Sequence, residues 1–134
     1  MKSTYVRSAS LTLRGFGLTP EEVQCIVGAT AESSGLRGNP VTQGVATLLK
    51  RSFTCYEVEF IDGCRLDEMI QKLLSSLGGV SNLSLAKEKI RPEFIEINLV
   101  LPVKYSEEQE GGFLLPSTLT EIAQLGASLS FEFL

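Results

Sequence analysis

Residues 94–103 read Phe94-Ile95-Glu96-Ile97-Asn98-Leu99-Val100-Leu101-Pro102-Val103, and this stretch decides the fold class. Successive side chains of a strand point to opposite faces, so one face is apolar and the other carries Glu96 and Asn98. Such alternation predicts a sheet with one buried and one solvated face, which is typical of antiparallel sheets. Pro102 predicts that the strand ends, or bulges, at a sheet edge.

The same alternation occurs near both ends of the chain. Residues 5–15 place Ala9, Leu11 and Leu13 on one face of a strand. The last predicted strand has these inward side chains: Ala127, Leu129, Phe131 and Phe133. Its outward side chains are Ser128, Ser130 and Glu132. Both segments therefore predict strands that are buried on one face only.

The middle of the chain predicts two further extended regions. Residues 45–60 read as a hairpin, and its second arm places Tyr56, Val58 and Phe60 opposite Glu57 and Glu59. A weaker extended piece is predicted near residues 80–85.

Three helices are predicted between these strands. The first begins at Thr19-Pro20-Glu21-Glu22, a capping box with proline at the first helical position, and ends at Gly28. The clearest helix covers residues 65–77, where leucine, isoleucine and methionine recur at helical spacing. A third covers residues 116–125, with Thr118 and Glu121 as its capping box. Its predicted buried side chains are Leu119, Ile122 and Ala123.

The predicted order is β-α-β-β-α-β-β-α-β. We expect a single α+β domain over residues 1–134, a two-layer sandwich in which three helices pack mainly on one face of a largely antiparallel sheet. With 134 residues, of which 43% are hydrophobic, the chain can build a core without a metal or a disulfide.

Composition excludes several kinds of chemistry. The chain has no histidine, so a Ser-His-Asp triad and a Cys-His pair are excluded. The three dispersed cysteines (Cys25, Cys55 and Cys64) are predicted to be buried or semi-buried free thiols of a reducing compartment, and they do not suit a zinc site. Gly15-Phe16-Gly17 lacks the third glycine of a dinucleotide fingerprint and reads as a turn. We predict no catalytic residue, no metal and no cofactor.

Charge and hydropathy indicate the kind of partner. The formal net charge is −4 and the positive charges are scattered, which disfavours nucleic acid. No apolar run is long enough to cross a bilayer, and the N-terminus shows no secretory signal, so we expect a cytoplasmic protein that does not bind membranes. A mildly acidic surface suits a basic protein partner.

Five carboxylates are the candidate partner-binding residues: Glu57, Glu59, Glu107, Glu108 and Glu110. Glu57 and Glu59 share one strand face, and they are either the solvated side of a half-buried strand or a hydrolase pair. The other three lie in an acidic loop, which is either solvated or recognises a basic partner.

The chain resembles the bacterial family catalogued as domain of unknown function 4279. The resemblance lies in Ser10-Leu11-Thr12-Leu13, then Gly17-Leu18-Thr19-Pro20-Glu21-Glu22-Val23 with Ile26-Val27-Gly28, the Gly38-Asn39-Pro40 loop, the helix at 66–77, and the ending from Gly112-Phe113 through Leu125-Gly126 to Phe131. The tryptophan often found in the family's central hairpin is absent; Phe53 stands near that position. The resemblance implies a compact α+β domain without an established activity. Small bacterial proteins of this kind often accompany toxin systems as immunity proteins.

These features predict a non-catalytic immunity or antitoxin-type protein that binds and neutralises a cognate bacterial toxin, a basic domain encoded nearby. The alternative is a small-molecule-binding or regulatory domain with a pocket under the 30–44 loop. An enzyme using carboxylates alone is a third hypothesis, and it would need two acidic groups converging in a cleft.

Overall fold

A computed structural model describes residues 6–60, 64–102 and 112–134. Its elements, in chain order, are β1 (Arg7–Arg14), α1 (Pro20–Val27), β2 (Ser33–Gly35), β3 (Phe53–Phe60), α2 (Leu66–Ser76), α3 (Gly79–Ile90), β4 (Phe94–Leu101), α4 (Pro116–Leu125) and β5 (Ser128–Phe133).

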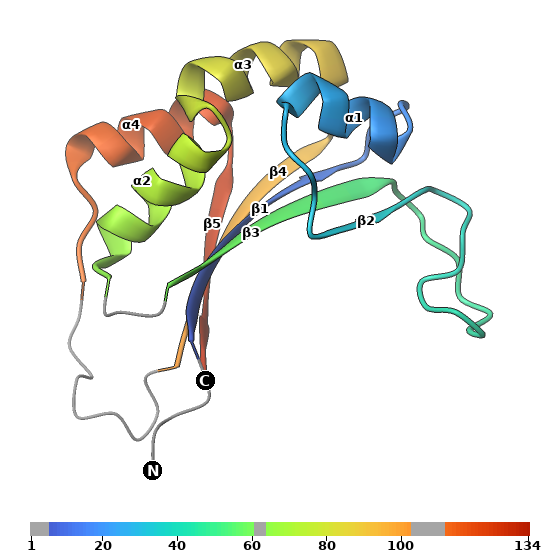
Figure 1. Ribbon diagram of the computed structural model, residues 1–134, viewed down its shortest axis with the longest axis horizontal. Coiled ribbons are helices and arrows are strands. Elements are labelled where there is room, and N and C mark those ends of the chain that lie inside the picture. The colour runs from blue at the N-terminus through green and yellow to red at the C-terminus, as the bar shows by residue number, and fades with distance from the viewer. Residues whose placement is uncertain (1–5, 61–63, 103–111) are drawn as a thin grey trace.

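The strands form one sheet in the order β2-β3-β1-β4-β5. Neighbouring strands are antiparallel, except that β5 runs parallel to β4. The described helices lie on one side of this sheet (Figure 1). The predicted two-layer α+β fold with a largely antiparallel sheet is therefore confirmed.

The core lies between the sheet and the helices. In the middle of the sheet Leu11 pairs with Tyr56 on β3 and with Ile97 on β4, and all three side chains are buried. The α2 side chains that pack onto this layer are Met69, Ile70, Leu73 and Leu74. Burial of each such side chain contributes roughly 1.5–3 kcal/mol, so the predicted helical stripe of α2 holds the two layers together.

The predicted start of α1 is confirmed. The Glu22 backbone N–H donates to Thr19 Oγ1 at 3.2 Å, and the Thr19 N–H donates to Glu22 Oε1 at 3.1 Å. The helix ends at Gly28, whose φ of 83° is the left-handed conformation that glycine adopts without strain. Helix α1 thus follows from a local signal at each end.

Helix α3 corrects the prediction of an extended piece at residues 80–85, and it makes four described helices instead of three. Gly78 and Gly79 both have positive φ and turn the chain directly from α2 into α3. The buried side chains of α3 are Leu83, Ala86 and Ile90. Their spacing is helical, but a window of six residues is too short to show it.

The predicted hairpin over residues 45–60 is also corrected. The second strand of that hairpin is present as β3, but β3 pairs with β1 and β2. Residues 36–51 instead fold back on themselves as a separate ribbon, which we call the arm; the Val41 N–H donates to the Thr47 carbonyl at 2.9 Å and the Leu49 N–H to the Asn39 carbonyl at 2.8 Å. The arm extends beyond the end of the sheet (Figure 1).

The bounds predicted for α4 and the burial of Ile122 are confirmed, but the predicted cap and the predicted burial of Leu119 and Ala123 are wrong. The N-cap residue is Leu115 and no side chain caps the helix. The buried stripe is Thr118, Ile122 and Leu125, whereas Leu119 and Ala123 are exposed. Strand β4 ends just before Pro102, as expected, yet it lies between β1 and β5 and not at an edge.

Candidate functional site

The face of the sheet turned away from the helices is the candidate site, and we call it the open face. No described element covers it (Figure 1). The pairing register places its side chains in rows across the sheet. Three successive rows are Glu59, Ser8, Val100 and Glu132; then Glu57, Ser10, Asn98 and Ser130; then Ser33, Cys55, Thr12, Glu96 and Ser128.

A line of short hydroxyl side chains runs along the centre of the open face. Ser8, Ser10 and Thr12 come from β1, the middle strand. Ser8 is only 6% exposed and Thr12 only 8%, because the longer side chains of β3 and β4 flank them. The surface of the open face is therefore recessed along β1, and the longer side chains of β3 and β4 stand out on both sides of it.

Carboxylates border this line. Glu57 and Glu59 are exposed on β3, directly opposite Ser10 and Ser8. Glu132 lies on β5 in the same row as Glu59. None of the ion pairs found within the described ranges includes any of these three. Their negative charges therefore act together on this part of the open face.

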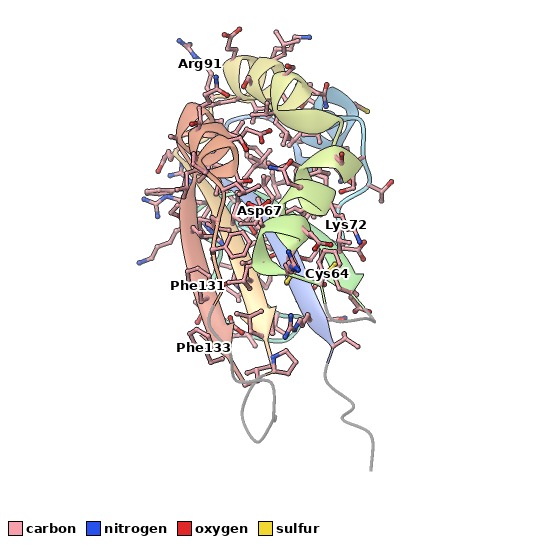
Figure 2. The ribbon with its side chains drawn as sticks, turned by 90° about the vertical axis from the view of Figure 1, so that its left-hand side faces the viewer. Cys64, Asp67, Lys72, Arg91, Phe131 and Phe133 are labelled. Atoms are coloured by element: carbon pink, nitrogen blue, oxygen red, sulfur yellow. The ribbon has the colours of Figure 1, made fainter. Side chains whose placement is uncertain are left out.

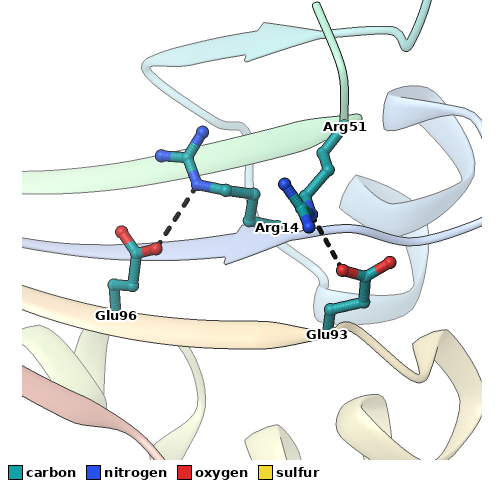
Figure 3. A network of polar contacts seen from close by, with 4 residues as sticks. All are labelled: Arg14, Arg51, Glu93 and Glu96. Carbon is teal, nitrogen blue, oxygen red and sulfur yellow. Dashed lines mark hydrogen bonds and ion pairs between the residues drawn. The ribbon is translucent and has the colours of Figure 1, made fainter.

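The end of the open face next to the arm carries two arginines. The Arg14 guanidinium lies over the Phe53 ring, 5.4 Å from its centroid, and pairs with Glu96 at 3.4 Å. The Arg51 guanidinium lies 5.3 Å from the Phe94 ring centroid. Its Nε donates to Glu93 Oε2 at 2.8 Å (Figure 3). Each pair is half-exposed and contributes about 1 kcal/mol or less, so both arginines are held in place but remain accessible.

The structure places two of the five predicted site residues. Glu57 and Glu59 lie on the open face, whereas Glu107, Glu108 and Glu110 fall outside the described residues. Sequence reasoning missed Glu132 as a site residue, although it had assigned this side chain to the outer face of the last strand. The missing information was the strand order, which brings β3 and β5 into one surface.

The described cysteines differ in exposure. Cys64 is buried and Cys55 is half-buried, as predicted, but Cys25 is exposed on α1. The Cys64 Sγ accepts from Lys72 Nζ at 3.4 Å, which places Cys64, just before α2, beside a side chain from the middle of that helix (Figure 2). All three are free thiols, and Cys55 alone belongs to the open face.

The described residues form no metal centre, and the cavity that they enclose lies on the helix side of the sheet, away from the open face. Within the described ranges, no three His, Cys, Asp or Glu side chains are grouped so that they could hold a metal ion. A cavity of about 10 Å³ lies between the sheet, α3 and α4, and it has room for one water molecule at most. Its lining residues are Leu11, Leu13, Leu83, Ala86, Lys87, Ile95 and Leu125. Residues 30–44 contribute none of them.

Comparison with models of known families, with curated proteins and with solved structures gave no match. Among the described helices, none has the length and apolar character needed to span a membrane. Function is therefore inferred from the chemistry of the open face.

Proposed function

We propose that this protein acts by binding rather than by catalysis, and that its open face docks a basic protein partner. The observation that supports this most strongly is the set of three carboxylates, Glu57, Glu59 and Glu132, around the hydroxyl line of β1. Carboxylates outside ion pairs steer a positively charged partner toward a surface and fix its orientation there.

The open face has the rigidity that recognition needs. Its side chains stand on four long strands whose backbone groups pair with one another, so their positions change little when a partner binds. With strands about 4.8 Å apart and a rise of about 3.4 Å per residue, the face spans on the order of 400–500 Å². An ordinary interface buries roughly 800 Å² on each partner, so a neighbouring surface must contribute as well.

The arm supplies that neighbouring surface. It joins the sheet at β3, beside Arg14 and Phe53, and it carries four exposed large apolar side chains, Leu36, Val41, Val45 and Leu48. Interfaces combine apolar anchors with a polar, charged rim. The arm offers the anchors and the open face offers the charge.

The partner that fits these features is a basic toxin domain encoded by a neighbouring gene, which makes the chain an immunity or antitoxin-type protein of the cytoplasm. Small size, a negative surface and a rigid docking face are what inhibition by occlusion requires. The acidity of this chain also complements toxins that act on nucleic acids, because the surface with which such a toxin binds nucleic acid must be basic.

The experiment is direct measurement of binding. The product of the adjacent gene is titrated with the full chain in a calorimeter, and we expect a 1:1 complex of nanomolar to micromolar affinity that weakens as salt is added. Absence of a complex in that range contradicts the proposal. So does turnover of any substrate that is lost when one carboxylate of the open face is changed.

A further inference from the structure

Strand β5 ends the sheet, and its outer edge pairs with no described strand. The Leu134 N–H donates to the Leu101 carbonyl at 3.0 Å, toward β4. Backbone groups alternate in direction along a strand, so the N–H and C=O groups of Ser128, Ser130 and Glu132 also point toward β4. Those of Leu129, Phe131 and Phe133 point outward, away from the sheet. They form a ready template for another strand.

Edge strands are usually protected by lysine, proline, a bulge or very short length. Strand β5 has six residues, Ser128–Phe133, with no proline or lysine and with Glu132 as its one charged residue. Phe131 is 42% exposed and Phe133 is 58% exposed. Their rings stack with centroids 6.3 Å apart, and both lie at the β5 side of the molecule (Figure 2). Among the described residues, this edge therefore has few of the usual protections against pairing with another strand.

We propose that the occupant of this edge is β5 of a second copy of the chain, in antiparallel orientation about a two-fold axis. Phe131 then lies opposite Phe131 of the second copy, and Leu129 opposite Phe133. All the outward-pointing residues of both strands become hydrogen-bonded pairs, and the aromatic side chains meet across the axis.

Backbone direction, charge and the length of β5 together select this register. A shift by one residue pairs outward-pointing groups with inward-pointing ones and forms no ladder. A shift by two residues in one direction places Glu132 opposite Glu132 of the second copy, where like charges repel. The shift in the other direction places Phe133 opposite Ala127, beyond the start of β5. In the register centred on Phe131, each Glu132 faces the uncharged Ser130 of the second copy, so no like charges are directly opposed.

The dimer continues one sheet through both copies. Directly opposed residues of antiparallel strands share a face, so the two open faces lie on the same side and the helices of both copies on the other. Glu132 lies next to the new junction, so the two acidic faces join into one surface. Dimer formation itself does not depend on the identity of any partner.

The test uses sedimentation velocity on the full chain over a concentration series to about 100 μM, where the unaltered protein is expected to be dimeric. Phe131→Glu and Phe131→Lys are each expected to be monomeric, because like charges meet on the axis. Their equimolar mixture is expected to recover a 1:1 heterodimer, since opposite charges then meet. Leu85→Glu, at a side chain 60% exposed on α3, is the matched control and remains dimeric.

Three results overturn the proposal: a monomeric unaltered protein, dimeric single variants, or a mixture that stays monomeric. Circular dichroism checks that each variant is folded. If the charged variants do not fold, Phe131→Pro replaces them, because it removes an outward N–H without breaking a bond to β4. A folded and dimeric Phe131→Pro variant also overturns the proposal.

Discussion

The hydroxyl of Thr118 on α4 accepts a hydrogen bond from Gln71 Nε2 on α2 at 2.9 Å. Thr118 is fully buried, and the same amide nitrogen also donates to Glu121 Oε1 at 2.9 Å. The sequence pattern Thr-x-x-Glu predicted that Thr118 and Glu121 cap their own helix. They instead join it to a helix far away in the chain, because the helix begins two residues before Thr118.

We expect Thr118→Val to lower the free energy of unfolding by about 1–2 kcal/mol. The change keeps the side-chain volume but removes the buried acceptor, so the Gln71 amide loses a partner. Urea denaturation measures the effect. Thr120→Val is the control: Thr120 is exposed on the same helix and its hydroxyl donates only to the Pro116 carbonyl, so a change below about 0.5 kcal/mol is expected. Equal losses in the two variants contradict the role assigned to Thr118.

Tyr56 gives a prediction of opposite sign. Its hydroxyl and that of Thr54 are buried, and neither has a well-aligned hydrogen-bond partner among the described residues. A buried polar group without a partner costs free energy, so Tyr56→Phe should raise the free energy of unfolding by about 1 kcal/mol. Thermal and urea denaturation both test this. A clear loss of stability would mean that the phenol group is satisfied in the folded protein.

The same residue predicts how stability changes in alkali. Burial raises the pKa of Tyr56 above its ordinary value of 10.0, and the nearby Thr54 hydroxyl lowers it only in part. Above about pH 10 the unfolded chain loses this proton while the folded chain retains it, so this contribution to stability falls as pH rises. Lysines titrate there too, so the informative quantity is the difference from Tyr56→Phe. We expect the advantage of that variant to be larger at about pH 11 than at about pH 8; a constant difference contradicts the assignment.

The sequence predicted the elements whose signals are local. The alternation in β4 and the stripe of α2 predicted the type and bounds of these elements to within a residue or two. Alternation also assigned Phe131 and Phe133 to the helix side of the sheet, where the register indeed pairs them with the buried Leu99 and Leu101. It could not show that both remain exposed, because coverage depends on where distant helices pack.

For the same reason, the sequence predicted which side chains point to the open face but not which strands form it. Strand periodicity shows that Glu57 and Glu132 point away from the core. That they belong to one surface follows from the strand order, which places β1 and β4 between them. The parallel pairing of β4 with β5 and the folding of the arm on itself are likewise tertiary features without a local signature.

Helix α3 was not predicted, and the glycine junction that leads into it from α2 can be tested. Gly78 has φ of 88°, and a Cβ there would lie 2.8 Å from Asn82 Nδ2, which donates to the Val27 and Leu77 carbonyls. Gly78→Ala should therefore lower the free energy of unfolding by about 1–2 kcal/mol. Gly17→Ala is the control, because Gly17 has ordinary φ and open space around it. Urea midpoints that shift equally would show that the junction tolerates a side chain.

Charge reversal on the open face distinguishes the role of its carboxylates from that of the net charge of the protein. The double variant Glu57→Lys, Glu59→Lys should associate with the basic partner about tenfold more slowly, or slower still, at low salt. The difference in association rate should shrink as salt is added, because electrostatic steering is screened over roughly 10 Å at 0.1 M salt. Stopped-flow or surface-plasmon measurements give the association rate. Glu88→Lys together with Glu21→Lys makes the same charge change on exposed helical residues away from the open face. If both double variants slow association equally, recognition depends on overall charge and not on the rows of carboxylates beside β1.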